Sequence, residues 1–108
     1  MSALENFEKM LAAGRDNALL RYSLGNEYLK AERYAEACTQ FEAALAFDPK
    51  YSAAWKLLGR ARMDLGQFAE AAEAYRQGIE VAEARGDVQA AKEMAVFRKR
   101  ALKQLGEG

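Results

Sequence analysis

The chain has 108 residues, 51% of them hydrophobic, and a single proline, a composition that favours helices and predicts one all-α domain. Lys and Arg together number 16, as do Asp and Glu, so no overall charge draws the protein to nucleic acid or to an anionic membrane. The absence of histidine excludes Ser-His and Cys-His catalytic pairs, and the single cysteine excludes an intramolecular disulfide.

The N-terminal residues carry acids and lack the basic start and apolar run of a signal peptide. No window approaches the roughly 18 to 20 apolar residues that a membrane span needs. We therefore expect a soluble, cytoplasmic protein with no membrane partner.

Helix start and stop signals, together with apolar residues at helical spacing, predict six helices. Ser2 and Glu5 form a capping box at the first start, and Asp48-Pro49 ends the third helix because proline removes a backbone donor. The other predicted caps are Asp16 or Asn17, Ser52 and Asp87, and Gly14, Gly66 and Gly86 are the predicted stops. The expected helices cover residues 2–13, 18–30, 34–47, 52–65, 68–85 and 87–105.

A 34-residue repeat organises these helices: Leu24-Gly25 returns as Leu58-Gly59 in the same helical phase. We expect a side chain at either glycine to push the two helices of a pair apart. The first helix fits as the second half of an earlier unit. Further matches at this spacing are Phe7, Phe41 and Tyr75; Leu11, Leu45 and Ile79; and Ala37 and Ala71.

This pattern resembles the tetratricopeptide repeat family. The resemblance rests on Leu24-Gly25, Tyr28, Ala37, Phe41, Ala44 and Pro49 in one unit and on Trp55, Leu58-Gly59, Ala71 and Tyr75 in the next. The chain departs from the family pattern at Arg21, Arg62, Gly78 and Glu83.

The resemblance implies an α-solenoid of antiparallel helix hairpins, about six helices forming a right-handed superhelix. It divides a single domain, residues 1–108, into a half-repeat helix (2–14), two repeats (18–51 and 52–85) and a C-terminal capping helix or degenerate half repeat (87–105). It implies no reaction.

No catalytic, metal or cofactor site is predicted, and we expect no enzymatic activity and no small-molecule substrate. Phosphate-binding glycine loops are absent, and without histidine a structural zinc lacks ligands. Cys38 follows Ala37 on a helix face that should be packed, so we expect a buried thiol that does not react.

In the family, the concave groove is lined by the first helix of each pair. One mode of binding clamps a partner's terminal carboxylate with Lys and Asn side chains. Asn26 matches that pattern, but Tyr22 and Leu57 stand where the family has Lys and Asn, so no full clamp is predicted. The resemblance places these residues in the groove: Tyr22, Asn26, Leu29, Lys56, Arg60, Met63, Lys92 and Lys99, with Leu19, Ala53 and Val96 beside them.

The predicted function is an adaptor that binds a peptide or helix of another protein, possibly an acidic one, in this groove. Lys56 and Arg60 point the same way because they stand one helical turn apart, although both cations also suit a solvated helix face. A homo-oligomerising scaffold, with a homodimer as its simplest form, is the first alternative. A less favoured one is a nucleic-acid accessory protein using the basic last helix, with Lys92, Arg98, Lys99, Arg100 and Lys103.

Overall fold

The computed structural model describes residues 2–106 and confirms the all-α prediction. Six helices follow one another with no strand in this range. No helix within it combines the length and the apolar composition that a membrane span requires. The helices are α1 (Ala3–Ala12), α2 (Ala18–Lys30), α3 (Tyr34–Phe47), α4 (Ser52–Asp64), α5 (Phe68–Ala84) and α6 (Val88–Gln104).

Three of the predicted caps form hydrogen bonds that fix where helices begin. Ser2 and Glu5 make the complete capping box at α1. The Asn17 side chain accepts a hydrogen bond from the Leu20 N–H at 2.8 Å, and Asp87 caps α6 in the same way. All six predicted helices therefore agree with the observed bounds to within one residue at each end.

The prediction that Ser52 caps the fourth helix is wrong: Ser52 is its first residue and Tyr51 is the N-cap. Asp48 causes the difference. Its side chain accepts a hydrogen bond from the Lys50 N–H at 3.0 Å, and its carbonyl accepts one from the Tyr51 N–H at 3.2 Å. This turn ends at Tyr51, whose own carbonyl accepts the first bond of α4, from Ala54 at 3.0 Å.

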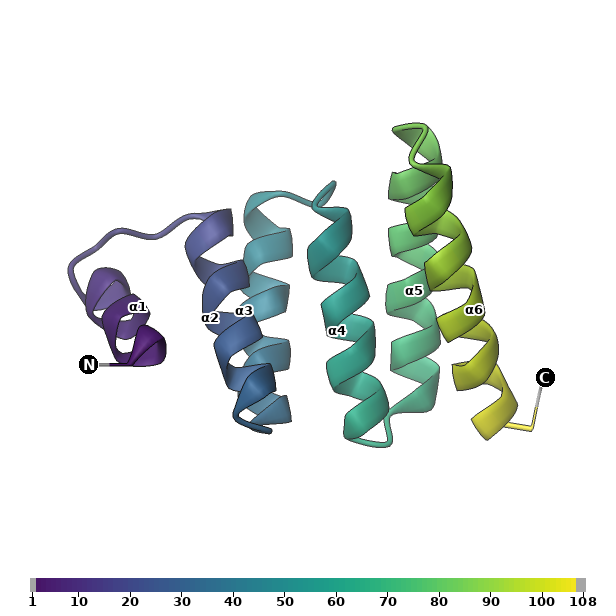
Figure 1. Cartoon of the computed structure of the whole chain (residues 1–108), viewed down its shortest axis with the longest axis horizontal. Coiled ribbons are helices and arrows are strands. Elements are labelled where there is room, and N and C mark those ends of the chain that lie inside the picture. Colours follow the sequence, from purple (N-terminus) through teal and green to yellow (C-terminus); the bar gives the residue numbers. More distant parts are fainter. Residues whose placement is uncertain (1, 107–108) are drawn as a thin grey trace.

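The helices stack side by side in two layers (Figure 1). Helices α2, α4 and α6 form the nearer layer in that view, α3 and α5 lie behind them, and α1 stands at one end. Nearly all contacts between helices join neighbours in the sequence, and the described chain is elongated, at 44 × 29 × 19 Å. Each helix pair therefore depends on its neighbours for burial of its apolar faces.

Glycines and aromatic rings lock each helix pair together at the repeated positions. A Cβ at residue 25 would lie 2.5 Å from the Phe41 ring, and a Cβ at residue 59 would lie 2.5 Å from the Tyr75 ring. Phe41 is completely buried. The helices are thus held at a distance at which the ring of α3 or α5 lies directly against the backbone of α2 or α4.

Two arginines at positions where the family favours aromatic residues are held by polar contacts. Arg21 pairs with Asp16 through two hydrogen bonds of 2.8 and 2.9 Å and also donates to Gln40 of α3. Arg62 donates to the Glu42 carboxylate and to the Glu70 carbonyl, each at 3.1 Å. Side chains from α3 and α5 therefore satisfy Arg62 on α4.

Helix α1 is attached more loosely than the others and has no buried residue. Leu4, Phe7 and Leu11 pack against the core while remaining partly exposed. The Tyr28 hydroxyl donates a hydrogen bond to the Glu8 carboxylate at 2.8 Å, which ties α1 to α2. The first half unit is anchored by one apolar face and one polar contact.

Candidate functional site

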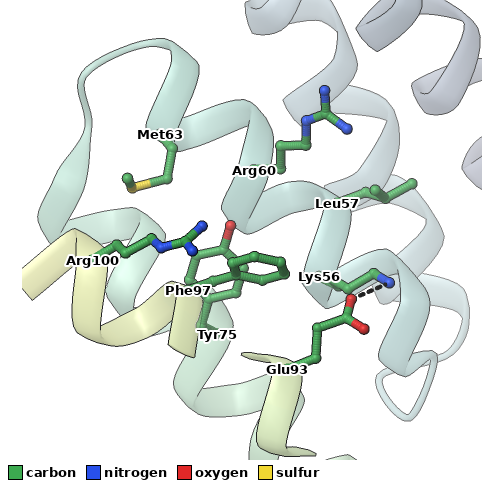
Figure 2. Close-up of a pocket in the computed structure, with 8 residues that line it drawn as sticks. All are labelled: Lys56, Leu57, Arg60, Met63, Tyr75, Glu93, Phe97 and Arg100. Atoms are coloured by element: carbon green, nitrogen blue, oxygen red, sulfur yellow. Dashed lines mark hydrogen bonds and ion pairs between the residues drawn. The ribbon is translucent and has the colours of Figure 1, made fainter. Parts of the chain in front are cut away.

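A pocket of about 430 Å³ lies between α4 and α6, with α5 beneath it. Because α4 and α6 belong to the same layer, the pocket opens on the side formed by the first helix of each pair (Figures 1 and 2). Its lining residues are Lys56, Leu57, Arg60 and Met63 from α4, Tyr75 from α5, and Glu93, Phe97 and Arg100 from α6.

Two aromatic rings form the apolar centre of the pocket. Tyr75 is only 3% exposed, and its ring lies against the backbone of Gly59. Phe97 is half-buried, with its ring centroid 5.7 Å from that of Tyr75 in a tilted arrangement. The same contact that holds α4 against α5 therefore also fixes the bottom of the pocket, and Phe97 offers a partly exposed ring to a ligand.

The positive charges around the pocket are not equivalent. Lys56 Nζ lies 2.8 Å from the Glu93 carboxylate, an ion pair that joins α4 to α6. Among the ion pairs of residues 2–106, none includes Arg60 or Arg100. The Arg100 guanidinium lies 5.6 Å from the centroid of the Phe97 ring, within range of a cation–π contact. Both arginines are exposed.

Burial raises the pKa of Tyr75 to about 12, and the carboxylate of Asp64 adds to the increase. The guanidinium groups of Arg60 and Arg100 act in the opposite direction and favour the phenolate. Both arginines therefore lie close enough to the hydroxyl to influence its charge. At neutral pH Tyr75 is uncharged and adds a hydroxyl to the pocket without adding an anion.

Three of the residues predicted to line the groove come together in the pocket: Lys56, Arg60 and Met63, all from α4. The residues predicted on α2 lie outside it. Tyr22 stacks on Tyr51, with ring centroids 4.9 Å apart. Asn26 is half-buried, and Leu29, at 7% exposure, belongs to the core.

The structure also differs from the prediction on α6. Lys92 and Lys99 are exposed and lie outside the pocket, which is instead lined by Glu93, Phe97 and Arg100. One residue corresponds to a rotation of about 100° around a helix. The side of α6 that faces α4 is therefore displaced by one residue from the predicted side.

Phe97 and Glu93 are pocket residues that the sequence did not reveal. Phe97 shares an apolar stripe with Met94, which is 1% exposed, and this spacing assigned both to packing. Only Met94 is fully covered. Since no described helix follows α6, the part of Phe97 that faces α4 remains open. An aromatic residue at the end of a repeat array was the available signal.

The basic residues of α6 point in different directions. Arg98 lies beside Glu73 in a shallow depression between α5 and α6, away from the pocket. The pKa of Glu73 is lowered mainly by its hydrogen bond with Arg76, with smaller contributions from Gln77 and Arg98. Arg100 faces the pocket instead. These cations do not form one continuous stripe on a single face.

Cys38 is buried as predicted, at 9% exposure. Burial raises the pKa of its thiol, so the thiolate is scarce at neutral pH. Within residues 2–106, no group of three or more His, Cys, Asp and Glu side chains is arranged to hold a metal ion. The pocket between α4 and α6 is thus the candidate site, and its groups are suited to binding an anionic, partly apolar ligand.

Comparison with known proteins gives consistent matches. The family described as tetratricopeptide repeat matches residues 1–49 and 22–87. A TPR repeat-containing protein of Pseudomonas aeruginosa is 51% identical over 94 residues, which cover 87% of this chain and 90% of the relative. The solution structure of a protein from Bordetella parapertussis has a TM-score of 0.83 at 42% identity, covering 96% of this chain and 90% of its own.

A longer relative is a heat-shock protein cognate co-chaperone of Aspergillus fumigatus. It is 32% identical to this chain over 106 residues. The match covers 98% of this chain and only 31% of the co-chaperone. The chain thus corresponds to one part of that larger protein.

Proposed function

Since this chain belongs to the tetratricopeptide repeat family, a family of protein-interaction modules, we propose that it is a non-enzymatic cytoplasmic adaptor. Its pocket between α4 and α6 takes a peptide or a helix of a partner protein. The observation that carries the proposal is the combination of unpaired Arg60 and Arg100 with the partly open ring of Phe97. The co-chaperone relative supports a protein as the partner.

An acidic segment fits this pocket best. Arginine binds carboxylates in a fixed, forked geometry, and both pocket arginines are exposed and free of ion pairs within residues 2–106. Met63 adds a flexible apolar surface that adapts to different side chains. The pocket therefore favours partners that present acidic and apolar residues together.

Affinity capture followed by mass spectrometry tests this function. The bait is the whole chain, compared with Lys56→Glu/Arg60→Glu, in a lysate of the organism that encodes it. We expect the variant to lose the partners that the unmodified chain captures, because two cations at the pocket become anions. Recovery of the same partners by both baits would refute binding in the pocket.

The matched control is Lys92→Glu/Lys99→Glu. It makes the same change in charge on exposed residues that do not line the pocket. We expect the control to retain the partners. Circular dichroism of each bait verifies that the helices remain folded.

A homo-oligomeric scaffold is the second candidate, and exposed apolar residues on the last helix favour it. Val88 is 61% exposed and Val96 is 51% exposed. Light scattering measures the mass in solution. A dimer that survives Lys56→Glu/Arg60→Glu and dissociates with Val96→Asp would assign self-association to the outer side of α6, whereas a monomer at all concentrations would exclude this candidate.

A further inference from the structure

The pocket has two chemically different ends. Figure 2 shows Lys56 and Glu93 joined at one end, Met63 and Arg100 at the other, and the rings of Tyr75 and Phe97 between them. The Lys56 ammonium already has a carboxylate partner at 2.8 Å. An incoming anion at that end would have to displace Glu93 or lie beside it, and like charges repel.

The other end offers positive charge without an internal partner. Arg60 on α4 and Arg100 on α6 stand on different walls of the pocket. One carboxylate between these walls would reach guanidinium groups on both helices. Lys56 and Arg60, neighbours on α4, are the pair that spacing along the sequence favours; the structure instead groups Arg60 with Arg100.

Depth separates the charged part of the pocket from the apolar part. Both arginines are exposed at the rim, whereas Tyr75 is buried and Phe97 is half-buried beneath them. A ligand that fits must therefore direct an apolar group inward and hold its carboxylate at the rim. An amphipathic helix does this with an apolar side chain and an acidic side chain one turn apart.

We propose that the pocket recognises one acidic side chain of an amphipathic partner helix, held between Arg60 and Arg100 while a neighbouring large apolar side chain rests on Phe97. Glu93 makes the opposite end selective against a second acidic residue. This proposal rests on the proposed function and specifies the chemistry of the partner.

The test uses designed peptides as probes and needs no natural partner. The first probe is a helical alanine-based peptide of about 18 residues, above the length at which isolated helices are marginal. Its termini are acetylated and amidated, and it carries Leu followed one helical turn later by Glu. The comparison probe has Gln in place of that Glu. Shifts in the nitrogen–proton NMR spectrum of the whole chain, including the arginine side chains, report binding.

We expect the Glu probe to shift signals around the pocket on α4 and α6 and to bind about fivefold more tightly than the Gln probe. Arg60→Gln and Arg100→Gln should each reduce this ratio, and the double variant should abolish it. The control is Lys99→Gln, which removes an exposed charge on α6 outside the pocket and should preserve the ratio.

A third probe tests Glu93 by adding a second Glu one turn on the other side of Leu. The unmodified chain should bind this probe no more tightly than the first, whereas Glu93→Gln, which releases Lys56, should bind it about threefold more tightly. Equal gains in both proteins would refute the selective role of Glu93.

Three results would overturn the recognition of an acidic side chain. One is equal affinity for the Glu and Gln probes; another is the absence of pocket shifts at about 5 mM probe, a concentration that populates a millimolar site. The third is a Gln probe with a free C-terminal carboxylate that binds as tightly as the Glu probe, since the arginines would then recognise chain ends. If lysate partners are still lost with Lys56→Glu/Arg60→Glu, the adaptor function survives any of these results.

Discussion

The ring of Tyr75 occupies the space in which a side chain at Gly59 would begin, with Cε1 of the ring 2.5 Å from the position of a Cβ. The same relationship joins Phe41 to Gly25, one repeat earlier. In the later repeat the ring has a second role because Tyr75 also lies at the bottom of the pocket. Packing between α4 and α5 and the shape of the binding site therefore depend on one contact.

Replacing Gly59 by alanine should destabilise the protein by about 1 to 2 kcal/mol. Alanine improves helix propensity by about 1 kcal/mol, but overpacking against a buried ring typically costs about 1 to 3 kcal/mol, and Tyr75 is held on its other side by Phe97. Urea unfolding followed by circular dichroism measures the change.

The matched control is Gly78→Ala, where the nearest obstacle is the flexible thioether of Met94, at 2.5 Å from the position of a Cβ. The thioether can turn away, although Trp55 Cβ at 3.0 Å gives less room. Gly78→Ala should therefore cost less than Gly59→Ala. An increase in stability with Gly59→Ala would show that the ring does not require glycine there.

Repetition explains why the sequence predicted the packing residues well. The Leu-Gly pairs and the facing aromatic residues meet the same steric demand in each unit, so they recur at a fixed spacing of 34 residues. Groove residues meet no such common demand. Arg60 and Met63 were identified through the family pattern, and the structure places both in the pocket.

The partners of those residues were beyond the reach of the sequence. Glu93 pairs with Lys56 from another helix, and that contact depends on the rotation of α6 about its own axis. Helix α5 extends past the position where Pro49 ends the corresponding helix, so the repeat spacing no longer fixes the side of α6 that faces α4. A rotation corresponding to one residue exchanges Lys92 for Glu93 in the pocket.

Glu32→Gly should stabilise the protein by about 1 kcal/mol. Glu32 ends α2 in the left-handed conformation, with φ of 60°, and Gly66 occupies the equivalent place 34 residues later with φ of 74°. A side chain in this conformation costs roughly 1 to 2 kcal/mol, part of which the greater freedom of glycine in the unfolded chain offsets. Thermal unfolding should show a rise of several degrees.

The control is Glu32→Ala, which removes the same carboxylate but keeps a Cβ. It should leave stability unchanged or lower it slightly. If alanine stabilises as much as glycine does, the effect comes from loss of charge and the backbone explanation is incorrect.

Arg62→Ala should destabilise the protein by about 1 to 2 kcal/mol. The Arg62 side chain is 18% exposed and connects α4 to the Glu42 carboxylate and the Glu70 carbonyl, so truncation removes both hydrogen bonds and the packing of the aliphatic stem. Arg33→Ala is the control, since its pair with Glu36 is about half exposed and contributes little. Equal losses in urea unfolding would show that the contacts between helices add nothing.

The raised pKa of Tyr75 predicts a specific loss of stability in alkali. The phenol is favoured in the folded protein up to about pH 12, whereas in the unfolded chain it ionises near the ordinary tyrosine pKa of 10.0. Tyr75 therefore contributes its full share of stability below pH 10, and that share falls as the pH rises toward 12, by up to roughly 2 kcal/mol.

Tyr75→Phe keeps the ring against Gly59 and removes the ionisable hydroxyl. Other tyrosines with raised pKa values, Tyr28, Tyr34 and Tyr51, are present in both proteins, so their effects cancel in the comparison. The free energy of unfolding, measured in urea from about pH 9 to pH 11, should fall more steeply in the unmodified chain than in Tyr75→Phe. Parallel curves would mean that the hydroxyl is hydrated in the folded protein and that the bottom of the pocket is wetter than the packing of Tyr75 against Gly59 and Phe97 implies.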